Sequence, residues 1–108
     1  MDYFGKLSGP AEAPGHVGYT LLTGENGCVN GCEAGISEYF CEEYMTPGCH
    51  DFQEGFYVIS GKGRVKIGGQ EKSVEAGDGF MAPAGVPHVM KTAEKGVPLR
   101  VLWFHAAV

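Results

Sequence analysis

The chain has 108 residues, of which 44% are apolar, and a formal net charge of −5 with only eight Lys and Arg residues. This length predicts one domain with a real core, and this apolar fraction excludes a disordered chain. No apolar run approaches the ~20 residues of a membrane-spanning helix, and binding to nucleic acid requires clustered positive charge. The N-terminus has no basic start followed by an apolar stretch, so we expect a soluble, cytoplasmic protein without nucleic-acid or membrane partners.

The chain is divided into short segments by 18 glycines and six prolines. No segment longer than about ten residues shows a helical apolar period, so strands are expected. Residues 1–15, with several Pro, Gly and Ala, are predicted to form an irregular arm, and 16–108 a single domain. Strands are expected, in chain order, over 18–23, 36–45, 54–60, 63–67, 70–79, 79–83, 88–92 and 99–106, with a tight turn at 68–69. A series of short strands like this predicts an all-β sandwich or barrel.

Two of the expected strands, 54–60 and 99–106, are apolar on both faces. In 99–106, for example, Trp103 and His105 share one face, whereas Leu102 and Phe104 share the other. An apolar outer face needs a second layer or a subunit contact to cover it. We therefore expect a homodimer.

The four cysteines are Cys28, Cys32, Cys41 and Cys49. Without a secretory signal, reduced thiols are expected rather than disulfides. Cys28 and Cys32 have a C-x3-C spacing, but a structural zinc site usually takes four ligands from two such pairs, and the second pair is missing. The sequence leaves the role of these thiols open.

His50 and Glu54 lie four residues apart, immediately before an apolar run. On one straight strand they would lie ~13 Å apart at ~3.3 Å per residue. That is too far for a shared ion, because ligand atoms lie ~2.0–2.2 Å from a transition metal. A shared site therefore requires the chain to turn within 51–53. The alternative is that the two side chains hydrogen-bond each other and tighten a turn without a metal.

Residues 77–92 form the second segment with candidate site chemistry. Pro83, Gly85 and Pro87 precede His88 at the start of an expected strand. Rigid prolines fix the local backbone and reduce the entropy lost on ordering. By itself, a single histidine after such a turn is more typical of a surface residue than of a ligand.

Residues 77–92 resemble one of the two motifs of the cupin superfamily of small β-barrels. This motif consists of Gly, five residues, Pro-x-Gly, two residues, His, three residues and Asn. The chain matches it at Gly77, Pro83, Gly85 and His88, with Thr92 in place of the asparagine.

The other cupin motif is matched in its second half. It consists of Gly, five residues, His-x-His, three or four residues, Glu, six residues and Gly. The chain has His50 as the second histidine, then Glu54 and Gly61, whereas Gly48 stands where the first histidine would be. The resemblance covers about 36–108.

The resemblance implies a double-stranded β-helix, or jelly-roll, barrel that comprises residues 16–108. It also implies metal ligands at His50, Glu54 and His88, with no catalytic residue assigned. Two histidines and one carboxylate suit a divalent transition metal such as Fe, Mn, Ni or Zn, and leave positions open for substrate. Water, Cys49 or His105 are the candidates for the missing ligand.

Aromatic and methionine side chains are available to line a barrel cavity or to form ordinary core. These are Phe52, Phe56, Phe80, Met81, Met90 and Trp103. Tyr39 or Tyr44 is a candidate proton donor if it faces inward, and His16 is expected at the surface.

Two classes of function follow from these residues. The first is a small metal-binding cupin that holds a small molecule inside the barrel, with dioxygenase, isomerase or decarboxylase chemistry in that order of preference. The second is a non-catalytic, sensor-type cupin that binds a small ligand without metal. A purely structural role is a weaker third reading, and whether the protein is an enzyme stays open, since one fold hosts many activities.

Overall fold

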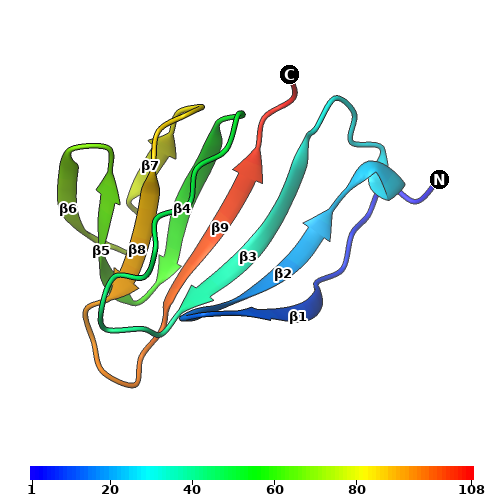
Figure 1. Ribbon diagram of the computed structural model, residues 1–108. Helices are drawn as coiled ribbons and strands as arrows, with labels where there is room; N and C mark the ends of the chain where they lie inside the picture. Colours follow the sequence, from blue (N-terminus) through cyan, green and yellow to red (C-terminus); the bar gives the residue numbers. More distant parts are fainter.

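The computed structural model describes all 108 residues, as nine strands and one short 3-10 helix (Figure 1). Two antiparallel sheets contain all the strands, in the orders β1-β2-β3-β9-β4-β7 and β6-β5-β8. The bounds are β1 Ser8–Ala13, β2 His16–Leu22, η1 Gly24–Asn26, β3 Glu33–Tyr39, β4 Glu54–Ser60, β5 Lys62–Ile67, β6 Gln70–Glu75, β7 Gly79–Ala82, β8 His88–Thr92 and β9 Leu99–His105. The predicted all-β class and jelly-roll barrel are confirmed.

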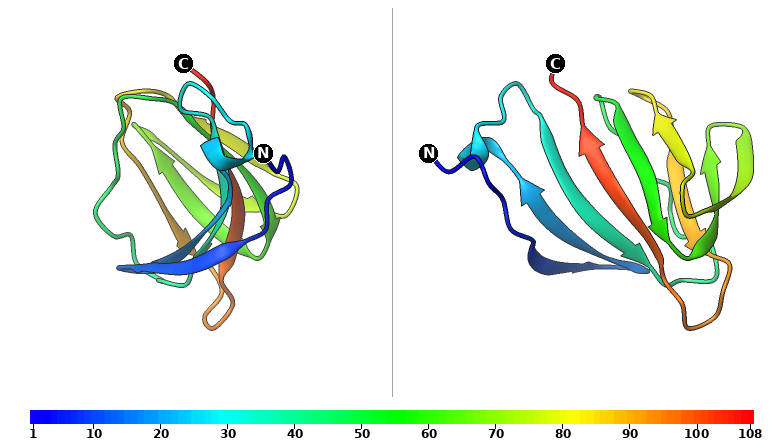
Figure 2. Two further views of the ribbon diagram at one scale, coloured as in Figure 1. Left: turned by 90° about the vertical axis from the view of Figure 1, so that its right-hand side faces the viewer. Right: turned by 180° about the vertical axis from the view of Figure 1, so that it is seen from behind.

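The two sheets differ in extent, and this difference positions the site. The three-stranded sheet lies at the end of the large sheet that carries β4 and β7, whereas β1 and β2 lie at the opposite end (Figure 1). In the views of Figure 2 the large sheet curves, and its β1–β2 end extends beyond the small sheet. The small sheet therefore packs against β4 and β9, whereas β1 and β2 extend beyond it.

Three of the expected elements are corrected by the structure, and the first is the strand expected over 70–79, because β6 ends at Glu75 and a turn leads to β7. Residues 8–13, within the arm that we expected to be irregular, form β1 and pair with β2, so regular structure begins at Ser8. The expected strand over 36–45 is wrong in its second half, because β3 ends at Tyr39. Residues 40–53 then run as an irregular segment that returns to β4.

The core lies between β4 and β9 of the large sheet and β5 and β8 of the small one. Val58, Leu99 and Val101 are fully buried, and Val65 and Met90 pack against them from the small sheet. The inner face of β9 is therefore the one that also carries Trp103 and His105, and the inner face of β4 is the one that carries Glu54. The same alternation points Glu54 and His105, at the ends of these strands, toward the interior.

The outer faces of β4, β7 and β9 remain exposed around Tyr57, Met81 and Phe104. The expected homodimer, which would cover such a face, stays a prediction. No helix in the structure is both long enough and apolar enough to cross a membrane.

Candidate metal centre

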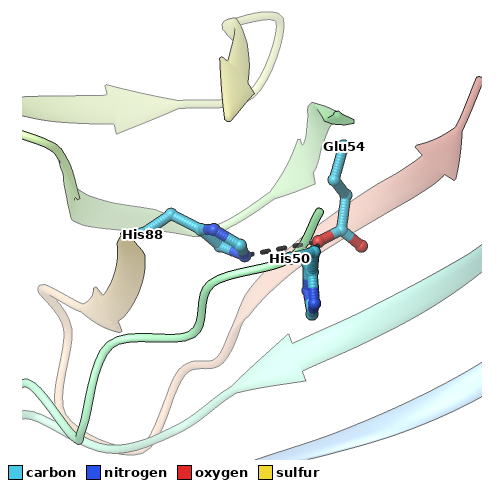
Figure 3. Close-up of side chains that lie close together, drawn as sticks. All are labelled: His50, Glu54 and His88. Carbon is cyan, nitrogen blue, oxygen red and sulfur yellow. Dashed lines mark ion pairs between the residues drawn. The ribbon is translucent and has the colours of Figure 1, made fainter. Parts of the chain in front are cut away.

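His50, Glu54 and His88 come together at the mouth of the barrel (Figure 3). The Glu54 Oε1 atom lies 3.4 Å from Nε2 of His50 and 3.3 Å from Nε2 of His88. One ligand atom from each residue lies within 4.8 Å of the others. The three residues that the sequence analysis named therefore form one cluster, with Glu54 and His88 mostly buried and His50 38% exposed.

His50 reaches Glu54 because the chain bends between them. Residues Asp51 and Phe52 form a bend, and β4 begins only at Glu54. The ring of Phe52 stacks on the His50 ring, with centroids 4.8 Å apart and planes 1° from parallel. The turn that a shared site requires within 51–53 is thus present.

Backbone hydrogen bonds to β8 and to the turn before it hold the segment that carries His50. The amide of Gly48 donates to the His88 carbonyl at 2.9 Å, and the His88 amide donates to the Gly48 carbonyl at 2.8 Å. The Gly85 amide donates to the His50 carbonyl at 2.7 Å. Gly85 has φ +77°, a conformation that glycine adopts without a steric penalty. These bonds bring His50 and His88 to the same place.

His105 is a fourth member of the cluster, which the sequence analysis considered only as one candidate for the missing ligand. It ends β9, opposite Glu54 of β4 on one side and Glu33 of β3 on the other. Its Nε2 lies 2.8 Å from Oε2 of Glu54, and its Nδ1 lies 3.7 Å from Oε1 of Glu33. The two oxygens of Glu54 are therefore divided, Oε2 toward His105 and Oε1 toward His50 and His88.

The environment of Glu54 favours the charged carboxylate. Burial by itself favours the neutral acid, but hydrogen bonds from His88 and His105 and their charge outweigh it and lower the pKa of Glu54 below its ordinary value. An ionised carboxylate only accepts hydrogen bonds, so His105 donates its Nε2 proton to Oε2. Oε1 is left with a negative charge directed at two histidine nitrogens.

This arrangement fits a divalent transition metal. Two ligand atoms ~2.0–2.2 Å from an ion lie about 2.8–3.1 Å apart at right angles and about 3.3–3.6 Å apart at tetrahedral angles. The separations of Oε1 from the two Nε2 atoms, 3.4 and 3.3 Å, match the tetrahedral case. Two imidazoles and one carboxylate match the donors that Fe, Mn, Ni and Zn accept. The Nδ1 atom of His88 is buried without a partner, so the ring is held from its Nε2 side.

Gly48 stands at the position of the first histidine of the cupin motif, and it faces the cluster. A Cβ atom built on Gly48 would lie 3.8 Å from Nε2 of His88, an ordinary contact distance. No side chain there supplies a ligand. Cys49 next to it is exposed, as a neighbour on the opposite face of an extended chain would be.

We expect Gly48→His to add a ligand and to bind a divalent ion about 10-fold more tightly or better, a gain of ~1.4 kcal/mol. A Cβ atom on Gly48 meets its neighbours only at ordinary contact distance and Gly48 has no positive φ, so the backbone should keep its conformation in this variant. Competition with a chromophoric chelator measures the affinity. Gly48→Ala, which fills the space without a ligand, is the matched control, and equal affinities of the two variants would contradict the expectation.

The cavity beside the cluster has a volume of about 500 Å³. Phe56, Met90 and Trp103 line it, and Phe56 and Met90 also belong to the buried core, so both roles left open by the sequence apply to them. Phe80 and Met81 line a second cavity of about 590 Å³ between β6 and β7. Gly35 lies opposite Trp103 in the β3–β9 pair. A Cβ atom at this position would overlap the indole, so the observed position of the Trp103 ring requires glycine here.

The structure gives the positions of three polar side chains that the sequence analysis predicted wrongly or left undecided. His16, expected at the surface, lines the cavity from β2 and stacks on Tyr39 at 4.9 Å. Tyr39 faces inward, and burial and the Glu54 charge raise its pKa. Tyr44 lies outside the cavity, where its hydroxyl donates to Glu71 at 2.7 Å. All four cysteines are free, as predicted.

The fold and the site define a small all-β barrel with histidine and glutamate side chains gathered at its mouth. The sequence pattern of the family described as the cupin domain matches residues 42–105, and the chain belongs to the cupin family. A comparison with curated proteins gives no match.

Similar solved structures are also cupins. An RmlC-like cupin from Shewanella frigidimarina NCIMB 400 has 16% identity and a TM-score of 0.73, over 96% of this chain and 85% of that one. The Cnp3 cupin domain of Schizosaccharomyces pombe has 17% identity and a TM-score of 0.74, over 86% and 61%. Hydroxypropylphosphonic acid epoxidase (HppE) from S. wedmorenis has 14% identity and a TM-score of 0.72, over 85% of this chain and 51%, about half, of its own. At such identities the likeness concerns the fold.

Proposed function

We propose that this protein is a metal-dependent cupin that binds a small organic molecule in the cavity beside His50, Glu54 and His88. The observation that carries the proposal is the convergence of two histidine nitrogens on one buried carboxylate oxygen, at 3.4 and 3.3 Å. The structures of HppE with Fe(II), and of HppE with Co(II) and substrate, support the proposal because there a similar fold holds a divalent ion.

The three side chains would hold the ion with two neutral nitrogens and one negative oxygen. A bound ion of this kind supplies Lewis-acid or redox chemistry and binds a chelating substrate. The turn at Asp51 and Phe52 and the bonds from Gly48 to His88 fix the geometry before a ligand arrives. Tyr39 stays a neutral phenol and can hold a proton toward the cavity, since its pKa is raised. Dioxygenase chemistry is our first choice, ahead of isomerase and decarboxylase chemistry.

Elemental analysis of protein purified without a histidine tag or chelators tests the proposal. We expect about one transition-metal ion per chain, retained in His16→Ala. This variant is a matched control, because His16 lines the same cavity but lies outside the cluster. Absence of any bound ion after anaerobic reconstitution with Fe(II), Mn(II), Ni(II) and Zn(II) would reject metal dependence.

The alternative is a sensor-type cupin that holds a small ligand without metal. The cavity of about 500 Å³ favours it as much as it favours an enzyme, because ligand sites commonly fall between 300 and 1,000 Å³. A ligand that survives purification in metal-free protein, identified by native mass spectrometry, would select this alternative.

A further inference from the structure

Strands β2 and β3 contribute part of the wall of the cavity that the metal cluster also lines. Alternation along β2 turns His16, Gly18 and Thr20 to the cavity, and along β3 it turns Ser37 and Tyr39 the same way. These side chains do not belong to the group that would hold the ion. They line the same cavity, so they can contact a molecule that the ion binds.

The wall is aromatic and hydroxylated, and it carries no permanent positive charge. His16 stacks on Tyr39 with ring centroids 4.9 Å apart and planes at 20°. Trp103 lines the same cavity and packs on the His105 ring, with centroids also 4.9 Å apart. No lysine or arginine lines the cavity. The net charge of the whole chain is −5, and exposed carboxylates such as Glu33 lie near the mouth.

Charge balance at the cluster limits the ligand. A divalent ion and the single carboxylate of Glu54 leave a net charge of about +1, since neutral histidine nitrogens add none. A singly charged chelating ligand brings this sum to zero. A doubly charged ligand leaves an excess negative charge in a partly buried cavity, which is costly without a partner.

We propose that the cavity selects planar cyclic compounds that chelate the ion through two adjacent oxygens as a monoanion, and discriminates against phosphates, phosphonates and dicarboxylates. The ring lies against His16 and Tyr39, and Ser37 and Thr20 offer hydroxyl groups to a ring substituent. This inference rests on the proposed metal dependence and names the substrate class for the same site.

Co(II)-loaded protein titrated with three probes tests this selectivity. The titration is run at a pH above the ionisation of tropolone and the second ionisation of phenylphosphonate. Under these conditions tropolone is a planar ring with an oxygen pair and one negative charge, oxalate is a dianion without a ring, and phenylphosphonate is a dianion with a ring. Each dissociation constant, read from the visible absorption of Co(II), is divided by the constant of the same probe for the free ion. We expect the normalised affinity for tropolone to exceed that for either dianion by roughly 10-fold or more. This ratio corresponds to the free-energy cost of one uncompensated negative charge in a partly solvated site.

Two variants separate the charge effect from the ring effect. Thr20→Lys introduces a cation on the cavity face of β2 and should raise the normalised affinity for both dianions roughly 10-fold. His16→Ala should weaken tropolone about threefold to tenfold, the value of one ring contact, and leave oxalate unchanged. Neither residue belongs to the metal cluster.

The outcomes distinguish the two proposals. Equal normalised affinities, or a preference for oxalate or phenylphosphonate in protein that does bind Co(II), would overturn the substrate class and leave metal dependence standing. Failure to bind Co(II) and each of the four ions used for reconstitution would overturn both, since the charge balance requires an ion.

Discussion

Replacing Glu54 by glutamine should lower the affinity for a divalent ion by at least about 100-fold, more than the loss of a residue that merely supports a ligand. Its Oε1 atom is the one that both His50 and His88 face, so the ion would lose its anionic ligand from the centre of the cluster. Glutamine preserves the volume of the side chain but removes the negative charge. Competition against a chromophoric chelator gives the affinity of both proteins.

Glu71→Gln is the matched control for this experiment. Glu71 also accepts hydrogen bonds, from Tyr44 at 2.7 Å and from Arg64 at 3.3 Å, but it lies outside the cavity. Its replacement removes the same charge from the chain and should leave metal affinity unchanged. If Glu54→Gln folds, as judged by circular dichroism, and binds the ion as tightly as the wild-type protein, the ion is held elsewhere.

The fold was predictable where local patterns determine it. Strands β4 and β8 have the bounds that were expected from their apolar residues and flanking turns. The two-residue turn at Gly68 and Gly69 joins β5 to β6 with Ile67 opposite Gln70. Such turns need little more than residues that accept positive φ, so the sequence carries the information in place.

The return segment was not predictable from local patterns. The aromatic and apolar residues at the start of segment 40–53 favour a continuation of β3 beyond Tyr39. The backbone groups there instead form hydrogen bonds with residues outside β3 and its sheet neighbour β9. The Phe40 amide donates to the Gly15 carbonyl, and the Cys41 carbonyl accepts from Thr92. Partners this distant in sequence are set by tertiary packing, which overrides strand propensity.

The candidate site was predicted only in part, because some of its contacts depend on residues that are distant in sequence. His50, Glu54 and His88 were found because their spacing matches cupin motifs and a turn was required between the first two. The placement of His105 on the inner face of β9 followed from alternation with Trp103, but its contact with Glu54 depends on how β4 and β9 are aligned. Register between strands that are about 45 residues apart is a property of the whole barrel.

His105 is, by this alignment, a positioning residue for Glu54. It holds Oε2 at 2.8 Å and so leaves Oε1 as the one oxygen that faces the histidines. We expect His105→Leu to weaken metal binding about 10- to 100-fold, the usual cost of losing such a supporting hydrogen bond. The freed carboxylate can then bind through both oxygens, which should change the visible absorption spectrum of bound Co(II).

His105→Gln separates positioning from other roles, because its amide nitrogen can still donate to Oε2. This variant should recover most of the affinity and the wild-type Co(II) spectrum, whereas a ligand role for His105 predicts that Gln and Leu lose affinity alike. If His105 acted only by filling space, both variants would keep the wild-type spectrum, because Leu and Gln each fill most of the volume of the ring. Glu33→Gln, on the other side of the His105 ring at 3.7 Å, should leave the spectrum unchanged, since only the contact with Glu54 selects which oxygen binds.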